Sequence, residues 1–552
     1  MPVVRVKRWR LEELTGFAPR ELEELLFRLK CELEVREDYA YIEVNSDRPD
    51  MLIGEGIARA VKGLLGERRG WRLPETARSR VSLRASSVPS RPYVACAVIK
   101  NVDIDSEDFL EELIQFQEKL HDGLGRRRRK AAIGLHDLSK LPSESVEYTL
   151  VSLGSRFKPL GGSGELTVEE VLESTEKGRA YGGIALYGGA HPALVSGGEI
   201  IAIPPVLNSE VTRVEVGTRH LFVDVTGTDE RLVETILDII ASTLSERRGA
   251  VVELVEVKRG ESSRVYPVFR SKRLTVASSF FTQTLGVELS PGEVVDGLER
   301  MLHNASASGE EVVVDVAPFR VDVLKPVDLA EDLAISLGYD RIAEGSRSHR
   351  VYTVGSLLEE TRLARRVREL MVGYGFVEVS RLMLTSPRLL EALKVAEVAL
   401  RVSNPVQLEY SVLRPTLAAS LLDVLREEQH KEKPLKLFEL GPVASRLKRP
   451  AEEDIRLGAA ILDYSVGYED IQAVVYSLLR LLGVSFTTEP SRIPFLIEGR
   501  QALLRAGGTA IGWLGEVRPD ILEATGIEYP TAIAEISLDA LLETLRRALS
   551  TP

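Results

Sequence analysis

The chain contains 552 residues, of which 44% are hydrophobic and 28% are charged, and its formal net charge at pH 7 is −12. This length exceeds what one hydrophobic core supports, so we expect several domains. The acidic balance excludes a general electrostatic coating of nucleic acid, which needs clustered lysine and arginine, but it leaves room for local basic patches.

The sequence carries no evident targeting or redox signal. No run of about eighteen apolar residues occurs, so we expect no membrane span. The charged start of the chain lacks the apolar core of an export signal, which predicts a cytoplasmic protein. Cys31 and Cys96 belong to no C-x-x-C motif, so we expect them to be packing residues and not part of a disulfide or a zinc site.

The first predicted module covers residues 1–85 and consists of a small α+β unit followed by a linker. Residues 18–35 have the period of a helix, and residues 48–66 predict a second helix. Between them, residues 39–45 favour a strand. Residues 72–93 are rich in serine, proline and arginine, which is typical of a linker.

The second predicted module, residues 86–268, is rich in strands. Helices are expected at residues 107–125 and 230–247. Strand-like runs lie at residues 93–102, 129–138, 179–188, 199–208 and 220–227. The basic run Arg126–Lys130 follows the first of these helices, and it is either a solvated loop or a contact for a nucleic-acid backbone.

Two further modules are predicted, residues 269–345 and residues 346–552. The last module alternates helical runs such as residues 358–375 with strand-like runs such as residues 505–515 and 531–538. The predicted fold class is therefore α+β, arranged in several modules. Neither a P-loop, nor a Gly-x-Ser-x-Gly elbow, nor a His-Glu-x-x-His motif is present, so the common nucleotide and hydrolase signatures are absent.

Four carboxylates fall within eleven residues of the third module: Asp322, Asp328, Glu331 and Asp332. The last three are spaced i, i+3 and i+4, so on a helix they share one face and repel one another by a few tenths of a kcal/mol per pair. One interpretation is a capping box, with Asp328 as N-cap and Glu331 three residues later. The other is a bound hard cation, which takes oxygen ligands.

Asp322 favours the cation, because a capping box leaves it unexplained. It belongs to the alternating run of residues 312–323, which predicts a half-buried strand with Asp322 facing the acids of the helix. Carboxylates from a strand and from a helix entry, completed by waters, are the kind of shell that magnesium or calcium takes. Both interpretations stay open at this point.

The candidate binding pocket lies in residues 204–230. Period two places Phe222, Asp224, Thr226 and Thr228 on one face of a strand. Such a polar row either lines a pocket or forms the wet face of an exposed edge strand.

Polar residues elsewhere in the second module add to this candidate. Asn208, Ser209 and Glu210 follow a Pro-Pro turn and supply donors and a carboxylate. His136 and Asp137 lie in the sequence GLHDL, although a lone histidine is more often structural than catalytic.

Five stretches, in order along the chain, resemble the β chain of the phenylalanyl-tRNA synthetase family in its shorter archaeal and eukaryotic form. They are residues 43–63, 131–138, 203–229, 319–342 and 401–443. In that family the β chain joins a shorter α chain, two copies of each, and the α chain carries the aminoacylation site that uses ATP. The resemblance therefore implies an α-subunit partner in a heterotetramer, with tRNA(Phe) as a further partner.

The resemblance also implies a fold and a cofactor. The third module would be small, helical and winged-helix-like, and the last would be a degenerate class II synthetase domain built on an antiparallel sheet. No Gly-rich, Arg-containing closing motif follows residues 411–422, so we assign no adenylate chemistry to this chain. The family's magnesium site has carboxylates spaced as Asp322, Asp328, Glu331 and Asp332 are, which implies Mg2+ as cofactor.

The second module resembles the family's editing domain, which hydrolyses tyrosine wrongly attached to tRNA(Phe). By this resemblance Asp224 pairs with the tyrosine phenol, because a site made for a hydroxyl rejects the analogue that lacks one. Thr226, Asn208 and Glu210 would orient the ester and a water. No nucleophile with an adjacent base stands out, so we expect a positioned water, helped by the terminal hydroxyl of the tRNA.

Two other functions remain as alternatives. The chain could be a non-enzymatic scaffold that assembles the synthetase and binds tRNA, with a decayed editing pocket. It could also be an unrelated nucleic-acid-binding protein that shares these modules, although the acidic charge and the order of the motifs count against this.

Overall fold

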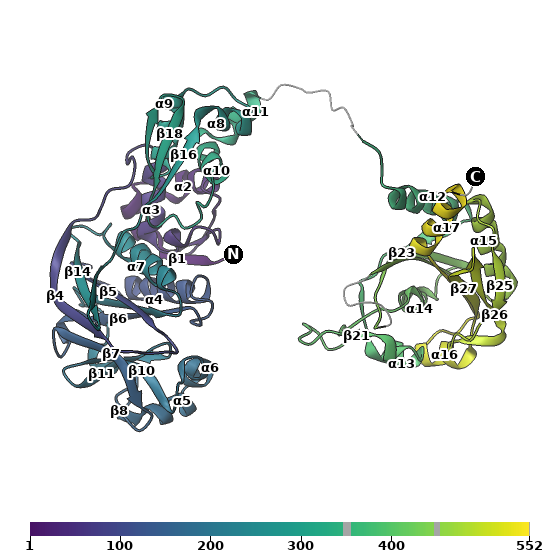
Figure 1. The fold of residues 1–552 in the computed structure, drawn as a ribbon, viewed down its shortest axis with the longest axis horizontal. Coiled ribbons are helices and arrows are strands. Elements are labelled where there is room, and N and C mark those ends of the chain that lie inside the picture. The colour runs from purple at the N-terminus through teal and green to yellow at the C-terminus, as the bar shows by residue number, and fades with distance from the viewer. Residues whose placement is uncertain (346–354, 447–452, 551–552) are drawn as a thin grey trace. The chain divides into compact units, whose positions relative to one another are not determined.

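The structure, a computed structural model, describes residues 1–345, 355–446 and 453–550. The chain divides into two compact units, residues 1–349 and residues 350–552, and each is described by itself (Figure 1). Both units combine helices with sheets, which confirms the mixed, multidomain class. No helix within the described ranges is long and apolar enough to cross a membrane.

The first unit begins with a three-stranded antiparallel sheet. Its strands, in spatial order, are β1 (Val3–Lys7), β3 (Tyr39–Glu43) and β2 (Glu32–Arg36). The surrounding helices are α1 (Arg8–Thr15), α2 (Pro19–Arg28), the 3-10 turn η1 (Pro49–Met51) and α3 (Gly54–Leu64). The predicted helix over residues 18–35 is wrong beyond α2, because Lys30 has a φ of 62° and the chain then turns to pair β2 with β3.

A ten-stranded sheet forms the centre of the first unit. Its main path, in spatial order, is β12 (Leu207–Asn208), β11 (Glu199–Ile203), β10 (Ala190–Ser196), β7 (Ser145–Ser152), β4 (Thr76–Ala85), β14 (Val251–Arg259), β5 (Tyr93–Lys100), β13 (Leu221–Gly227) and β6 (Ala131–Asp137). The tenth strand, β15 (Ser262–Tyr266), pairs with β14. The predicted linker is wrong at residues 76–85, since this segment is β4.

The large sheet curls until its two end strands meet. β12 contacts β6, and the Asn208 amide donates a 2.9 Å hydrogen bond to the Leu135 carbonyl. Two helices cover the outer face: α7 (Glu230–Leu244) packs on β5 and β13, and α4 (Glu107–Asp122) packs on β6. The residues on the other face of β13 therefore lie inside the curl.

Short elements decorate the large sheet. They are η2 (Leu138–Lys140), β8 (Arg156–Phe157), β9 (Leu166–Thr167), α5 (Val168–Ser174), α6 (Glu176–Ala185) and η3 (Glu210–Thr212). The strand predicted over residues 179–188 is wrong, because most of it belongs to α6, whose first turn is capped by the Thr175 hydroxyl.

The first unit ends with a second three-stranded sheet and its helices. The strands, in spatial order, are β16 (Lys272–Ala277), β18 (Glu311–Val316) and β17 (Asn304–Ser308). The helices are α8 (Ser278–Leu285), α9 (Pro291–Arg300), α10 (Pro326–Leu337) and α11 (Tyr339–Gly345). The strand predicted through residue 323 ends at Val316, so Asp322 lies in a turn before α10.

The second unit is built on a seven-stranded sheet. Its strands, in spatial order, are β19 (Val377–Glu378), β23 (Leu435–Val443), β24 (Asp454–Leu462), β28 (Thr531–Ser537), β27 (Thr509–Val517), β26 (Leu496–Ala506) and β25 (Thr487–Pro490). Only the β19–β23 pair is parallel among these pairings. A small sheet joins β20 (Leu384–Thr385), β22 (Val412–Leu413) and β21 (Leu400–Arg401).

Helices pack on both faces of the seven-stranded sheet and form two separate cores. One core involves α12 (Glu359–Gly373), α15 (Tyr468–Leu481) and α17 (Leu538–Ser550). The other involves α13 (Pro387–Ala392), α14 (Leu417–Glu428) and α16 (Pro519–Thr525), next to the turn η4 (Ala396–Val398).

Candidate functional site

Asp224 lies in the interior of the curled sheet. Its strand β13 runs between β5 and β6, where Asp224 stands opposite Cys96 on one side and Gly134 on the other. Asp224 is only 1% exposed and Thr226 is fully buried. The predicted polar row holds for Phe222, Asp224 and Thr226, which lie in β13, but Thr228 lies beyond the end of the strand and is exposed. The alternative of a wet edge strand is wrong, because β13 has a neighbouring strand on each side.

A chain of hydrogen bonds runs from Asp224 through His136 to Thr212. His136 Nε2 lies 2.9 Å from Asp224 Oδ1, and His136 Nδ1 lies 2.7 Å from the Thr212 hydroxyl. His136 is fully buried. Burial and the Asp224 carboxylate raise the pKa of the Cys96 thiol well above its usual range, so this cysteine stays a neutral packing group.

Arg91 brings a buried guanidinium to the other end of the polar row. Its Nη2 donates to the Thr226 carbonyl at 2.6 Å, and its Nε donates to the Thr226 hydroxyl at 3.3 Å. The Tyr148 hydroxyl donates to the Arg91 carbonyl at 2.9 Å. Burial lowers the pKa of Arg91 to about 10, with the Tyr148 phenol and Asp224 opposing that shift. The buried groups bonded along this row therefore include the Asp224 carboxylate and the Arg91 guanidinium.

Neither Asn208 nor Glu210 is bonded to the Asp224 side chain. The Asn208 amide bonds to the backbone of β6 one residue before His136, so it helps to close the curl. Glu210 instead accepts the backbone N–H of Gly161 at 2.8 Å and pairs with Arg213 at 3.2 Å. The Gly161 N–H and Arg213 lower the pKa of the Glu210 carboxyl.

The residues that sequence reasoning undervalued are His136, Arg91 and Gly134. His136 could have been weighted higher, because two strands that pair in register carry it and Asp224 on the same face. Gly134 has a clear role, since a Cβ there would lie 2.0 Å from Asp224 Oδ1 and 2.8 Å from His136 Nε2. Arg91 lies in the predicted linker, which offered no signal for it.

Three of the four carboxylates at the start of α10 are bonded to basic side chains of the chain itself. Arg320 Nη2 lies 2.7 Å from Asp322 and 2.7 Å from Asp332, and His303 Nε2 lies 2.7 Å from Asp332. Lys30 pairs with Glu331 at 2.9 Å. Asp332 is buried, and Arg320 and His303 hold the pKa of its carboxyl far below the usual range against the effect of burial.

Asp328 caps α10, but in a different frame from the predicted one. Lys325 is the N-cap residue, and Asp328, three residues later, accepts the N–H groups of Leu324 and Lys325 at 2.7 Å each. The predicted pair of Asp328 and Glu331 is wrong, because α10 begins at Pro326, two residues before Asp328. A carboxylate at this position of a helix satisfies backbone donors that have no partner within the helix.

The four carboxylates do not fit a single cation as they stand. Among the described residues, no three His, Cys, Asp or Glu side chains come together as a metal-ligand group. Arg320 already lies between Asp322 and Asp332, and Lys30 holds Glu331. A cation at this place would have to displace at least the Arg320 guanidinium from both of its carboxylates.

The basic run Arg126–Lys130 is only partly available to a partner. Arg128 is buried and donates to the carbonyls of Pro205 at 3.0 Å and Val206 at 2.8 Å. It also pairs with Glu118 at 2.5 Å. Arg128 therefore fixes the turn before β12. For this residue, the predictions of a solvated loop and of a contact to a nucleic-acid backbone are both wrong.

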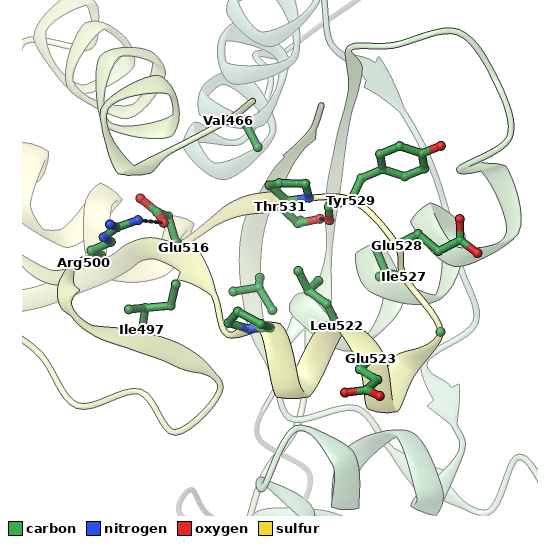
Figure 2. A pocket seen from close by; sticks show the side chains of 14 residues that line it. Val466, Ile497, Arg500, Glu516, Leu522, Glu523, Ile527, Glu528, Tyr529 and Thr531 are labelled. Carbon is green, nitrogen blue, oxygen red and sulfur yellow. Dashed lines mark hydrogen bonds and ion pairs between the residues drawn. The ribbon is translucent and has the colours of Figure 1, made fainter. Parts of the chain in front are cut away.

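The second unit contains a cavity of about 760 Å³ between the end of β27, α16 and the start of β28 (Figure 2). Three carboxylates line it, Glu516, Glu523 and Glu528. Its arginine, Arg500, is bonded to Glu516 at 2.8 Å. This lining is unfavourable for the phosphates of a nucleotide, which need cations that carboxylates have not already neutralised.

Comparisons with known proteins agree along the whole chain. The family described as phenylalanyl tRNA synthetase beta chain CLM domain matches residues 346–538, and the family described as tRNA synthetase B5 domain matches residues 274–339. The phenylalanine–tRNA ligase beta subunit of Aeropyrum pernix is 53% identical over 98% of this chain and 99% of its own length. The chain belongs to the phenylalanyl-tRNA synthetase β-chain family.

Further members of the family support this assignment. The phenylalanine–tRNA ligase beta subunit of Saccharolobus solfataricus is 38% identical over 99% of this chain and all of its own length. A crystal structure of an N-terminal fragment of the phenylalanyl-tRNA synthetase beta subunit from Pyrococcus horikoshii superposes with a TM-score of 0.59. It is 33% identical and covers 61% of this chain and the whole fragment.

Proposed function

We propose that this chain is the β subunit of a phenylalanine–tRNA ligase and acts with an α subunit, two copies of each, on tRNA(Phe). The α subunit would use ATP and attach phenylalanine. The acidic lining of the cavity in the second unit supports this division of labour. The second unit would then be a degenerate class II synthetase domain whose role is assembly, and residues 269–345 would form a winged-helix-like module.

We further propose that the curled sheet is an editing site that hydrolyses tyrosine wrongly attached to tRNA(Phe). The observation that carries this proposal is the buried carboxylate of Asp224, which points into the curl beside His136. A buried acceptor loses free energy when it is left without a donor, so such a site favours a ligand that brings a hydroxyl. Phenylalanine offers none, which gives the selectivity.

The residues around Asp224 would divide the work as follows. His136 holds one oxygen of Asp224, and the second oxygen would accept the phenol O–H of tyrosine. Thr226, fixed by Arg91, and Asn208 would position the ester. Glu210 would orient the water that attacks the ester carbonyl, and the products are free tyrosine and tRNA with its terminal hydroxyl restored.

We propose a magnesium site only for the assembled enzyme, with ligands from Asp322, Asp328, Glu331 and Asp332. Oxygen-only ligands are what magnesium prefers. The proposal requires the α subunit to supply further ligands and Arg320 to release Asp322 and Asp332. Metal content of the purified heterotetramer, compared with that of the isolated β chain, tests it: the assembled form should hold the cation and the isolated chain should not.

The proposed editing function is tested on the enzyme assembled from both subunits. Hydrolysis of Tyr-tRNA(Phe) should be much faster than hydrolysis of Phe-tRNA(Phe) under the same conditions. If both esters are hydrolysed only at the rate seen without enzyme, while phenylalanine is still attached, the chain is a scaffold with a decayed pocket and the editing proposal fails.

A further inference from the structure

A second pocket, of about 1020 Å³, lies at one end of the curled sheet. Residues 86–92, which connect β4 to β5, form one wall, and the turn after β14 forms another. Three cationic residues line this pocket, Arg84, Lys258 and Arg259, and no carboxylate does. In a chain with a net charge of −12, a concave surface of this charge stands out as a place for an anion.

Two of the three cations have no counter-ion. Lys258 pairs with Glu256 at 3.4 Å. Among the described residues, neither the exposed side chain of Arg84 nor the half-buried side chain of Arg259 makes an ion pair or a side-chain hydrogen bond. The Nε of Arg259 is buried with no acceptor, while its guanidinium lies 5.4 Å from the centre of the Tyr93 ring. A buried donor without a partner points to a ligand that supplies the acceptor.

This pocket adjoins the polar interior that contains Asp224. The connecting loop turns Arg91 inward to Thr226, and the N–H of Ser86 donates to the Tyr148 carbonyl at 2.8 Å. By the pairing of β14 with β4 and of β4 with β7, the side chain of Arg259 is on the same sheet face as Tyr148. Arg84, which is paired with Lys258, is on the opposite face, so the pocket lies across the ends of these strands. Burial is the main reason that the pKa of the Tyr148 phenol is raised. The charge of Asp224 raises this pKa further and the charge of Arg259 lowers it, so both groups act on the phenol.

We propose that this pocket binds the phosphate backbone of single-stranded RNA at the 3′ end of the aminoacylated tRNA. The inference rests on the proposed editing function. If the terminal nucleotide presents its amino acid to Asp224, the phosphates before it must lie outside the curl. Arg84 and Arg259 would each contact a phosphate, and Ser86 and the Tyr93 ring would offer a hydrogen bond and an apolar surface to a base.

RNA fits this surface better than an acidic protein segment does. A concave pocket with separate cations, a hydroxyl and an aromatic ring matches the alternation of phosphate, sugar and base in a single strand. A carboxylate on a partner protein would use the cations but would leave the aromatic ring without a planar group to stack on. The experiment treats protein binding as a contrary outcome.

The test replaces both unpaired arginines in the assembled enzyme, as Arg84→Gln with Arg259→Gln. A control of equal charge replaces two exposed, paired arginines, as Arg36→Gln with Arg219→Gln. Binding of unacylated tRNA(Phe) is measured as a function of salt, so hydrolysis plays no part. A single strand contributes about 0.7 to the slope of log K against log salt for each phosphate contact, so the double variant should lose about 1.4 while the control keeps the slope.

A second tRNA, lacking its single-stranded 3′ end, separates this contact from others. Wild type and double variant should bind the truncated tRNA equally, and the Km for hydrolysis of Tyr-tRNA(Phe) should rise in the variant with little change in kcat. An unchanged salt slope, an equal loss on truncated tRNA, or loss of association with the α subunit would overturn the proposal. If the double variant does not fold, Arg84→Gln alone, at an exposed side chain, should lower the slope by about 0.7.

Failure of the editing function would be recognised separately. If neither ester is hydrolysed but the double variant still loses its salt slope on intact tRNA alone, the pocket binds RNA and the editing proposal is wrong. If hydrolysis is normal and the slope does not change, the editing proposal stands and the RNA pocket is wrong.

Discussion

Gly134 lies directly opposite Asp224 in the curled sheet, and a Cβ on residue 134 would lie 2.0 Å from Asp224 Oδ1. The carboxylate therefore occupies the space that a side chain at residue 134 would take. Residue 134 must be glycine, because any side chain there would collide with Asp224 and with His136, which follows two residues later on the same strand.

Gly134→Ala should abolish hydrolysis of Tyr-tRNA(Phe) while phenylalanine attachment by the assembled enzyme continues. The added methyl group forces Asp224 and His136 apart, and overpacking of this kind costs about 1–3 kcal/mol. Gly164→Ala is the matched control, because a Cβ there meets nothing within 4 Å. Unimpaired hydrolysis by Gly134→Ala would show that Asp224 does not need its present position.

Prediction from sequence succeeded where the side chains follow the regular period of a strand or a helix. The alternation around Asp224 placed it on the correct face, because a strand buried on both sides still turns each side chain by half a turn. It failed at β4, because the serine and arginine content of that segment is typical of a linker. It also failed after α2, because the positive φ of Lys30 turns the chain out of the predicted helix. Arg320 was invisible as a partner of Asp332, since only the folded turn joins them.

Asp328 and Glu331 should differ in their effect on stability. Asp328→Ala removes the acceptor of two backbone N–H groups and should lower the free energy of unfolding by about 1 kcal/mol. Glu331→Gln breaks a pair with Lys30 that is partly exposed, which should cost less than about 0.5 kcal/mol. Denaturant unfolding of both variants measures this, and equal losses would contradict the assigned cap.

Arg320→Met should destabilise the first unit by about 3–5 kcal/mol, because it leaves Asp322 and Asp332 without their shared cation. The vacated space is lined by carboxylate oxygens, so Mg2+ should raise the melting temperature of the variant. Wild type, in which Arg320 fills that role, should gain much less. Thermal unfolding with Mg2+ and with sodium chloride of equal ionic strength checks this, and equal responses of the two proteins would refute it.

Asp238 should make stability depend on pH. Burial raises the pKa of its carboxyl from 3.8 to about 6, although it accepts N–H groups from Val268, Phe269 and Arg270. The native state therefore keeps a proton that the unfolded chain has released. The contribution of the protonated form is complete below pH 3.8 and is lost as the pH rises through about 6, by about 3 kcal/mol in all.

Asp238→Asn removes this titration, so the variant's free energy of unfolding should fall less than that of wild type between pH 4 and pH 6. Urea unfolding at a series of pH values provides the comparison. Parallel curves for the two proteins would mean that Asp238 keeps an ordinary pKa in the folded chain.

The central claim is that the buried carboxylate of Asp224 recognises the tyrosine hydroxyl, and Asp224→Ala in the assembled enzyme tests it most directly. Hydrolysis of Tyr-tRNA(Phe) should become slower, with a loss of about 1.5–3 kcal/mol of transition-state stabilisation, the range for a hydrogen bond to a charged group. Formation of Phe-tRNA(Phe), measured on the same preparation, should be nearly unchanged. If hydrolysis persists at the wild-type rate, or if both activities fall together with the melting temperature, Asp224 supports the fold and does not select the substrate.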